Sequence, residues 1–213
     1  TGTPIGLQSR SSMPVIWGGT HPTIRPEECL DHADMVCVGE GEETLMELTR
    51  KMQKEEYYHD LKGMGFNING KKIINKLREL PGSEKAIIKT LDEIPFQDHD
   101  YNSHFILLGK DIVKMNINIV TRLRLNEFYQ TQPTRGCPFA CTFCVNNTFI
   151  AMHPHQKPIR KRSVDNVINE LQEVKKNLPF TKIILFDDDA FFIMPLEEIR
   201  DFAKKYKKLI KLP

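Results

Sequence analysis

The sequence predicts an α/β protein built on parallel strands, and three observations lead to this fold class. Two short apolar stretches, residues 14–17 and 35–38, each run into glycines, and a helical pattern follows at residues 42–54. The dipeptide Asn69-Gly70 marks a tight hairpin further along the chain. From residue 128 onward, two more strand patterns are each followed by a periodic helix. Strands that alternate with helices in this way are typical of a parallel sheet.

The first part of the chain predicts the closing half of a doubly wound parallel sheet. Residues 14–17 form an apolar strand that ends at Gly18-Gly19, and residues 35–38 form a second strand that ends at Gly-Glu-Gly, residues 39–41. Glycines at the carboxyl end of a strand let the backbone pass close to a ligand, and open α/β sheets bind ligands at this edge. We expect a loop at residues 20–26 and a short helical turn at residues 27–32.

The next elements are a helix and a connector. Leu45, Leu48 and Met52 fall on one face of a helix over residues 42–54, with acidic residues in the first turn, where the helix dipole favours them. Residues 55–128 are interpreted as a connector. In it, Asn69-Gly70 predicts a two-residue hairpin, because a type I′ turn needs positive φ at both positions. The alternation in Met-Asn-Ile-Asn-Ile-Val, residues 115–120, predicts one more strand.

The last part predicts two strand-helix units. A strand over residues 128–134 is followed, after a loop, by a helix for which Ser163 is the expected N-cap. A buried strand over residues 182–186 then ends in Asp187-Asp188-Asp189. The apolar stripe of the first helix contains Val164, Val167, Ile168, Leu171, Val174 and Leu178. The inner face of the last helix is expected to contain Leu196, Ile199, Phe202, Ala203, Tyr206 and Leu209.

Three cysteines in the loop between these units form the strongest motif of the chain. Cys137, Cys141 and Cys144 stand in a C-x3-C-x2-C spacing beside glycine and proline. Thiolates are soft ligands that suit iron-sulfur clusters or zinc. A cubic cluster has four irons, so three cysteines leave one iron open for a substrate or cosubstrate. The alternative is a structural zinc site with His153 or His155 as fourth ligand, although zinc sites usually present paired cysteines. A disulfide is disfavoured in a long chain without a secretory signal.

The cysteine loop resembles the signature of the radical S-adenosylmethionine (SAM) enzymes, which carry an aromatic residue before the last cysteine, in this chain Phe143. The resemblance implies that Cys137, Cys141 and Cys144 hold a [4Fe-4S] cluster and that SAM chelates the open iron. It implies that Phe143 packs beside the cluster and the adenine, and that an electron from the cluster cleaves SAM to a 5′-deoxyadenosyl radical. It also implies a small-molecule substrate and an electron donor of the flavodoxin or ferredoxin kind.

A second resemblance covers the first part of the chain. W-G-G-T-H-P-T-I-R-P-E-E-C-L, followed by D-M-V-C-V-G-E-G-E-E-T-L-M-E-L, is similar to the end of the cobalamin-binding domain that precedes the barrel in one class of radical SAM proteins. That class includes methyltransferases and the anaerobic cyclase of bacteriochlorophyll synthesis. The resemblance implies that Gly18 and Gly19 lie near the nucleotide tail of cobalamin. The alternative is a strand-end turn that needs positive φ and nothing more. His21 lies outside the cobalt-ligating motif of such domains and is not counted as a metal ligand.

The two resemblances together imply a domain organisation. Residues 1–58 would be the C-terminal part of a Rossmann-like cobalamin-binding domain, residues 59–127 the connector, and residues 128–213 the first two βα units of a partial TIM barrel. In parallel barrels the catalytic groups lie at the carboxyl ends of the strands. Phe-Asp-Asp-Asp-Ala-Phe, residues 186–191, resembles the stretch of this class that seats SAM, which implies that Asp188 and Asp189 accept hydrogen bonds from its ammonium group. Asp187 occupies the variable position, and the alternative is that the run caps the next helix.

Composition adds limits. The chain is 40% hydrophobic and 27% charged, with a net charge of +2, as in an ordinary soluble protein. No apolar run reaches the length of a membrane-spanning helix, and no signal peptide is recognised, so a cytoplasmic location is expected. Basic runs at residues 157–162 and 204–211 are interpreted as solvated faces and not as nucleic-acid contacts, because aromatic stacking positions are missing among them. Cys29 and Cys37 are expected to be buried without a functional role.

Two rival functions remain open at this point. A tRNA-modifying methylthiolating enzyme of the same superfamily would be expected to carry further cysteines in cluster spacing before the barrel, and Cys29 and Cys37 do not supply them. A zinc-binding interaction module without turnover is the other rival. We also expect the 213-residue chain made alone to aggregate, to bind the cluster poorly and not to turn over, because its two βα units fall short of the roughly six that a partial barrel needs.

Overall fold

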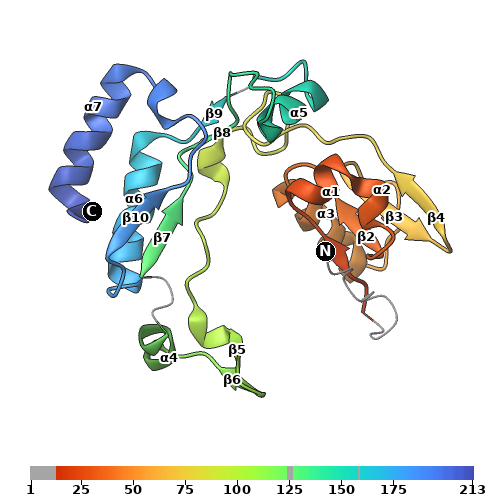
Figure 1. Ribbon diagram of the computed structural model, residues 1–213, viewed down its shortest axis with the longest axis horizontal. Helices are drawn as coiled ribbons and strands as arrows, with labels where there is room; N and C mark the ends of the chain where they lie inside the picture. The colour runs from red at the N-terminus through yellow and green to blue at the C-terminus, as the bar shows by residue number, and fades with distance from the viewer. Residues whose placement is uncertain (1–12, 124–126, 158) are drawn as a thin grey trace. The chain divides into compact units, whose positions relative to one another are not determined.

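The computed structural model describes residues 13–123, 127–157 and 159–213, and it divides into two compact units, each with its own α/β elements (Figure 1). The first unit runs to Leu91 and also contains Ala140–Lys157. The second unit comprises Asp92–Phe139 and Pro158–Pro213. The α/β fold class expected from the sequence is therefore confirmed. The domain limits 1–58, 59–127 and 128–213 stay a prediction.

The sheet of the first unit has four strands in the order β1-β2-β3-β4. They are β1 (Ile16–Trp17), β2 (Met35–Cys37), β3 (Met64–Ile68) and β4 (Lys71–Ile74). Strands β1 and β2 are parallel, in the register Ile16 to Met35, as the sequence predicts. Strands β2 and β3 are antiparallel, in the register Met35 to Phe66, so the predicted hairpin extends this sheet. Its turn is confirmed at Asn69 and Gly70, which have φ values of 52° and 84°.

Helices of the first unit are α1 (Thr20–Ile24), α2 (Pro26–Cys29), α3 (Glu42–Gln53) and α5 (Val145–Met152). The loop expected at residues 20–26 is wrong, because most of it forms α1. Its prolines do not prevent this. Pro22 lies in the first turn of α1 and Pro26 is the first residue of α2, where a backbone N–H has no helical partner to lose.

The interior of the first unit contains two apolar clusters. One surrounds Leu48, Met64 and Phe66, and the other surrounds Leu30 and Val36. Cys29 and Cys37 are buried in these clusters, as expected. The predicted inner face of α3 is confirmed only in part: Leu48 is fully buried and Leu45 is exposed.

Helix α3 differs from the prediction because it buries a charged residue that forms an ion pair. The face of α3 next to Leu48 contains Thr44 and Glu43, which are buried. Glu43 pairs with Arg78 and accepts the backbone N–H of Ile88, so its burial is compensated. An apolar periodicity cannot show that a charged residue belongs to the interior.

The second unit is built on two parallel strands, β7 (Phe128–Thr131) and β10 (Ile183–Phe186), which lie side by side in Figure 1. Helix α6 (Val164–Asn177) connects them, and Ser163 is its N-cap, as predicted, through a bond from the Asn166 N–H. The buried side chains of the predicted stripe, together with Tyr129, Ile184, Phe202 and Ile210, form one apolar cluster. The strand expected at residues 128–134 is interrupted before β8 (Thr134–Arg135), because Pro133 has no N–H for a ladder. Strand β8 pairs with β9 (Arg160–Lys161).

Two further predictions for the second unit need correction, and one hairpin was missed. The strand expected at residues 115–120 is instead the helix α4 (Ile117–Arg122), which begins because the Asn116 side chain accepts the Ile119 N–H. The hairpin of β5 (Phe105–Leu108) and β6 (Asp111–Lys114) was not predicted.

Helix α7 (Leu196–Lys205) continues into a π-helical turn, Tyr206–Ile210. The wider turn brings Ile210 into the core in place of the predicted Leu209. Leu196 and Ala203 are also exposed. The 3₁₀ turns are Leu91–Glu93, Tyr101–Ser103 and Phe191–Ile193.

A buried polar network links β7 to α6. The Glu170 carboxylate accepts hydrogen bonds from the Tyr129 hydroxyl at 2.8 Å and the Thr131 hydroxyl at 2.7 Å. The Arg162 guanidinium donates to the same carboxylate at 2.7 Å. Burial, with the bond to Glu170, raises the pKa of Tyr129 far above its usual range. Because each member has a partner, the network can lie inside the core without an orphaned charge.

Replacing Glu170 with methionine should destabilise the protein by about 3 kcal/mol, because it leaves the Arg162 guanidinium buried without a carboxylate. The measurement is the free energy of unfolding, from urea denaturation followed by circular dichroism. Glu173→Met, at an exposed position of the same helix, is the control and should change that free energy by less than about 0.5 kcal/mol. Equal effects of both substitutions would contradict the importance of the network.

Candidate functional site

The cysteine loop has a defined base in the second unit. Strands β8 and β9 pair Thr134 with Lys161 and Arg135 with Arg160, so the segment that enters the loop lies beside the segment that leaves it. The Arg162 N–H adds a bond of 2.9 Å to the Pro133 carbonyl. Arg162 also donates to Glu170, so the base of the loop is connected to the buried network. Both ends of the loop are thereby fixed to the core.

The boundary between the units falls within this loop, after Phe139. In the second unit, Cys137 follows Gly136, whose φ is 87°, and its side chain is buried. In the first unit, Cys141 is exposed and Cys144 is half-buried. The Cys144 N–H donates to the Cys141 carbonyl at 3.0 Å, and Cys144 is the N-cap residue of α5.

The donor set fits an iron-sulfur cluster by its chemistry, since it offers three thiols in short succession. Within residues 13–123, 127–157 and 159–213, no three His, Cys, Asp or Glu side chains are grouped so that they could hold a metal ion. Ligation by Cys137, Cys141 and Cys144 therefore stays a prediction. So does the role of Phe143, whose ring is 92% exposed and accessible to a ligand.

Asp188 connects the end of β10 to the start of the cysteine loop. Its carboxylate accepts the Thr134 N–H and the Thr134 hydroxyl, both at 2.7 Å, and the Ala190 N–H at 2.8 Å. Asp189 is exposed. The predicted SAM contacts of both residues are not tested by these bonds. The bonds give Asp188 a positioning role that sequence reasoning missed, because nothing in the sequence pairs it with Thr134.

A second candidate site lies at the carboxyl edge of the parallel strands β1 and β2. Gly18 and Gly19 follow β1 directly, and Gly39 follows β2 with Val38 between them. Gly19 and Gly39 have φ values of 99° and 92°, and a Cβ built on either would have no atom within 4 Å. The glycines are thus required by backbone conformation, and the space beside them is open. His21 contacts the Trp17 ring edge-on and lies 3.5 Å from Glu28.

One side chain connects the two glycine turns. The buried Thr23 hydroxyl donates to the Gly19 carbonyl at 2.7 Å and accepts the Gly39 N–H at 3.0 Å. No local pattern in the sequence marks Thr23, because its bond to Gly39 joins residues that lie sixteen positions apart. This hydroxyl is therefore bonded to both turns.

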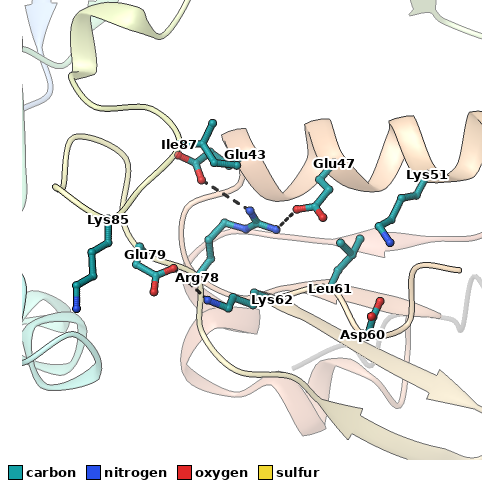
Figure 2. Close-up of a pocket in the computed structure, with 10 residues that line it drawn as sticks. All are labelled: Glu43, Glu47, Lys51, Asp60, Leu61, Lys62, Arg78, Glu79, Lys85 and Ile87. Carbon is teal, nitrogen blue, oxygen red and sulfur yellow. Dashed lines mark hydrogen bonds and ion pairs between the residues drawn. The ribbon is translucent and has the colours of Figure 1, made fainter. Parts of the chain in front are cut away.

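A pocket of about 370 Å³ lies elsewhere in the first unit (Figure 2). Arg78 lies at its centre and pairs with Glu43 at 3.7 Å and with Glu47. Its wall contains cationic and acidic side chains in equal number, so no single charge would select a ligand. The lining residues are Glu43, Glu47, Lys51, Asp60, Leu61, Lys62, Arg78, Glu79, Lys85 and Ile87.

Within the part of the chain that the structure describes, no helix has the length and apolar character needed to cross a membrane. This finding concerns the described helices alone. The cytoplasmic location expected from the sequence stays a prediction.

Two family models match the segments of the chain that contain the candidate sites. Residues 131–212 match the family model of the radical SAM superfamily and contain the cysteine loop and Asp188. Residues 6–49 match the model of the B12 binding domain and contain the glycine turns and Thr23. The two matches identify the chain as a radical SAM protein that also carries a B12-binding domain. The family resemblance inferred from the sequence is thereby confirmed.

Three curated proteins are among its relatives. The uncharacterized methyltransferase PH0819 of Pyrococcus horikoshii is 30% identical over 177 residues, which cover 82% of this chain and 33% of the relative. The cytidylyl-2-hydroxyethylphosphonate methyltransferase of Streptomyces wedmorensis is 24% identical over 90% of this chain and 37% of the relative. The anaerobic magnesium-protoporphyrin IX monomethyl ester cyclase of Cereibacter sphaeroides is 24% identical over 90% of this chain and 26% of the relative. The chain thus spans about a third of the length of the first two relatives.

Solved structures show the same α/β fold. The cobalamin-dependent SAM radical enzyme OxsB, with aqua-cobalamin and SAM bound, has a TM-score of 0.58 at 19% identity, over 91% of this chain and 24% of that chain. The radical SAM methyltransferase TsrM from Kitasatospora setae has a TM-score of 0.57 at 14% identity, over 92% of this chain and 33% of that chain. At these identities the likeness is one of fold.

In the metal-free protein at pH 8, iodoacetamide should label Cys141 before any other cysteine and leave Cys29 and Cys37 unmodified. The reactive form is the thiolate, and burial beside Glu42 raises the pKa of Cys37 to about 11, so that roughly one thousandth of this thiol is ionised at pH 8. Peptide mass spectrometry after graded exposure gives the order of labelling. Chain unfolded in guanidinium is the control and should be labelled at all five cysteines. Labelling of Cys37 as fast as Cys141 in the folded protein would contradict the assigned burial.

Asp188→Ala should loosen the start of the cysteine loop, because it leaves the Thr134 N–H and hydroxyl without their carboxylate, at a cost of about 1–3 kcal/mol. Hydrogen exchange followed by mass spectrometry should show faster exchange at residues 131–137. Asp189→Ala, at the exposed neighbouring position, should leave that exchange unchanged. Unchanged exchange in Asp188→Ala would show that the carboxylate does not hold the loop.

Proposed function

We propose that the protein containing this chain is a radical SAM enzyme that binds a [4Fe-4S] cluster, SAM and cobalamin, and that it performs cobalamin-dependent methyl transfer. One observation carries the proposal: the glycine turns of a B12-binding match and the C-x3-C-x2-C loop of a radical SAM match occur in one chain, in the family's order. Neither motif alone would define this class.

In this proposal Cys137, Cys141 and Cys144 hold the cluster. When bound and reduced, the cluster would supply one electron for the cleavage of SAM to methionine and a 5′-deoxyadenosyl radical. The chain's own residues bind and orient the reactants. Phe143 offers an exposed ring to the adenine, and Asp189 offers an exposed carboxylate to the ammonium group of SAM. Asp188, through Thr134, holds the start of the loop in place.

We further propose that β1 and β2 are the last parallel strands of a Rossmann-like sheet, which β3 and β4 extend, and that β7 and β10 are the first two strands of a partial barrel. Parallel pairing within each couple, and the connection of β7 to β10 through α6, support this assignment. Both candidate sites then lie at the carboxyl ends of parallel strands, which is where α/β sheets and barrels bind their ligands.

Methyl transfer is favoured over cyclisation because two of the three curated relatives are methyltransferases and one is a cyclase. The substrate is proposed to be a small molecule, and an electron donor of the flavodoxin or ferredoxin kind would reduce the cluster. A tRNA-modifying methylthiolating enzyme is disfavoured by the B12 binding domain match. A zinc module is disfavoured by the radical SAM match over the cysteine loop.

The test uses protein expressed from the complete reading frame and reconstituted without oxygen. It should bind about four irons with sulfide, and it should cleave SAM to 5′-deoxyadenosine when reduced. Alanine at Cys137, Cys141 or Cys144 should abolish both, and Cys29→Ala is the control that should retain iron. A colourless, air-stable protein with one zinc would contradict the proposal.

A separate measurement tests the cobalamin part of the proposal. Binding of hydroxocobalamin to the anaerobic protein is followed by the visible spectrum of the bound corrinoid after dialysis. Binding supports the cobalamin class. A protein that cleaves SAM without binding cobalamin would favour the methylthiolating alternative.

A further inference from the structure

Thr23 makes a connection that a helical threonine ordinarily does not make. Its bond to the Gly19 carbonyl, four residues earlier, is the common back-bond of threonine in a helix. Its bond from the Gly39 N–H reaches sixteen residues ahead, to the turn after the neighbouring parallel strand. A hydroxyl has one proton to donate, and Thr23 uses it on one turn while accepting from the other. The side chain is 6% exposed, so water cannot readily replace either bond.

These two bonds fix two peptide planes. Peptide groups are planar, so holding the Gly39 N–H fixes the peptide between Val38 and Gly39, and holding the Gly19 carbonyl fixes the peptide between Gly19 and Thr20. Glycine has the widest backbone freedom of any residue, and both glycines adopt positive φ with open space beside them. The Gly19 carbonyl also accepts the Thr23 backbone N–H at 3.2 Å. What the hydroxyl adds is therefore the direct bond from this turn to the Gly39 turn.

We propose that Thr23 is a positioning residue for cobalamin: its hydroxyl bonds the Gly19 turn to the Gly39 turn and keeps both in place before cobalamin binds. The inference rests on the proposed function, because it assigns these turns to the cobalamin site. It adds Gly39 and Thr23 to the glycine pair as parts of that site. Pre-ordered turns raise affinity because the ligand does not have to order them on binding.

The test measures the affinity of hydroxocobalamin for protein expressed from the complete reading frame, by equilibrium dialysis and visible absorbance. Thr23→Val keeps the branched shape and removes the hydroxyl. It should raise Kd about tenfold, which corresponds to about 1.4 kcal/mol. Thr23→Ser keeps the hydroxyl and should restore affinity to near the wild-type value.

Thr49→Val is the matched control. The Thr49 hydroxyl makes the same kind of back-bond, to the Leu45 carbonyl at 2.9 Å, on an exposed face of α3. Its loss should leave Kd unchanged. Thr49→Val should also retain the SAM cleavage of the wild type, and all three variants should retain its iron content, because the cysteine loop belongs to the other matched segment.

Three outcomes would overturn the inference. The first is that Thr23→Val binds hydroxocobalamin with a Kd within about twofold of the wild-type Kd, or as tightly as Thr49→Val does. Another needs no variant: rapid hydrogen exchange of the Gly39 amide in the cobalamin-free wild type would show that the bond to Thr23 does not hold the turn. The third is failure of the wild type to bind cobalamin, which would overturn the cobalamin role itself together with the inference. Binding by the wild type with no effect of Thr23→Val would leave the proposed function standing.

Discussion

The second unit depends on one constraint: the segment that enters the cysteine loop pairs with the segment that leaves it. The ladder between β8 and β9 sets the base of the loop, and the buried Glu170 with Arg162 anchors that base to α6. Asp188 anchors it to the end of β10. A loop that carries metal ligands must return them to one place, and this is achieved most simply by fixing its two ends. The loop can then remain irregular between them.

Both candidate sites use the same solution with different side chains. In each, a polar side chain forms a hydrogen bond to a loop that follows a parallel strand and holds that loop in place. A carboxylate on Asp188 does this through Thr134 in the second unit, and a hydroxyl on Thr23 does it through Gly39 in the first. Residues of this kind do not need to contact the ligand. They determine how much ordering is left for the ligand to do.

The sequence was sufficient where periodicity or local turn chemistry decides the structure. The parallel strands, the helices that begin at Glu42 and Val164, the Ser163 cap and the Asn69-Gly70 turn all have local causes. It was insufficient where one side chain overrides a pattern. Asn116 converts an alternating stretch into a helix, and the bonds of Thr23 and Asp188 join segments whose proximity only the fold creates. The cysteine motif could be recognised because its spacing is local. The gathering of its three sulfurs could not be derived, because it depends on the path of the loop.

The division of the chain into units has a consequence for the order of folding. The first unit includes Ala140–Lys157, and Met152 of that segment packs beside the cluster that contains Leu30 and Val36. The polypeptide therefore leaves the first unit after Leu91, returns at Ala140 and leaves again after Lys157. A ribosome that releases the chain from its N-terminus cannot complete the first unit until the whole cysteine loop has emerged. The unit that contains the B12 binding domain match thus needs a segment of the radical SAM match before its core is closed.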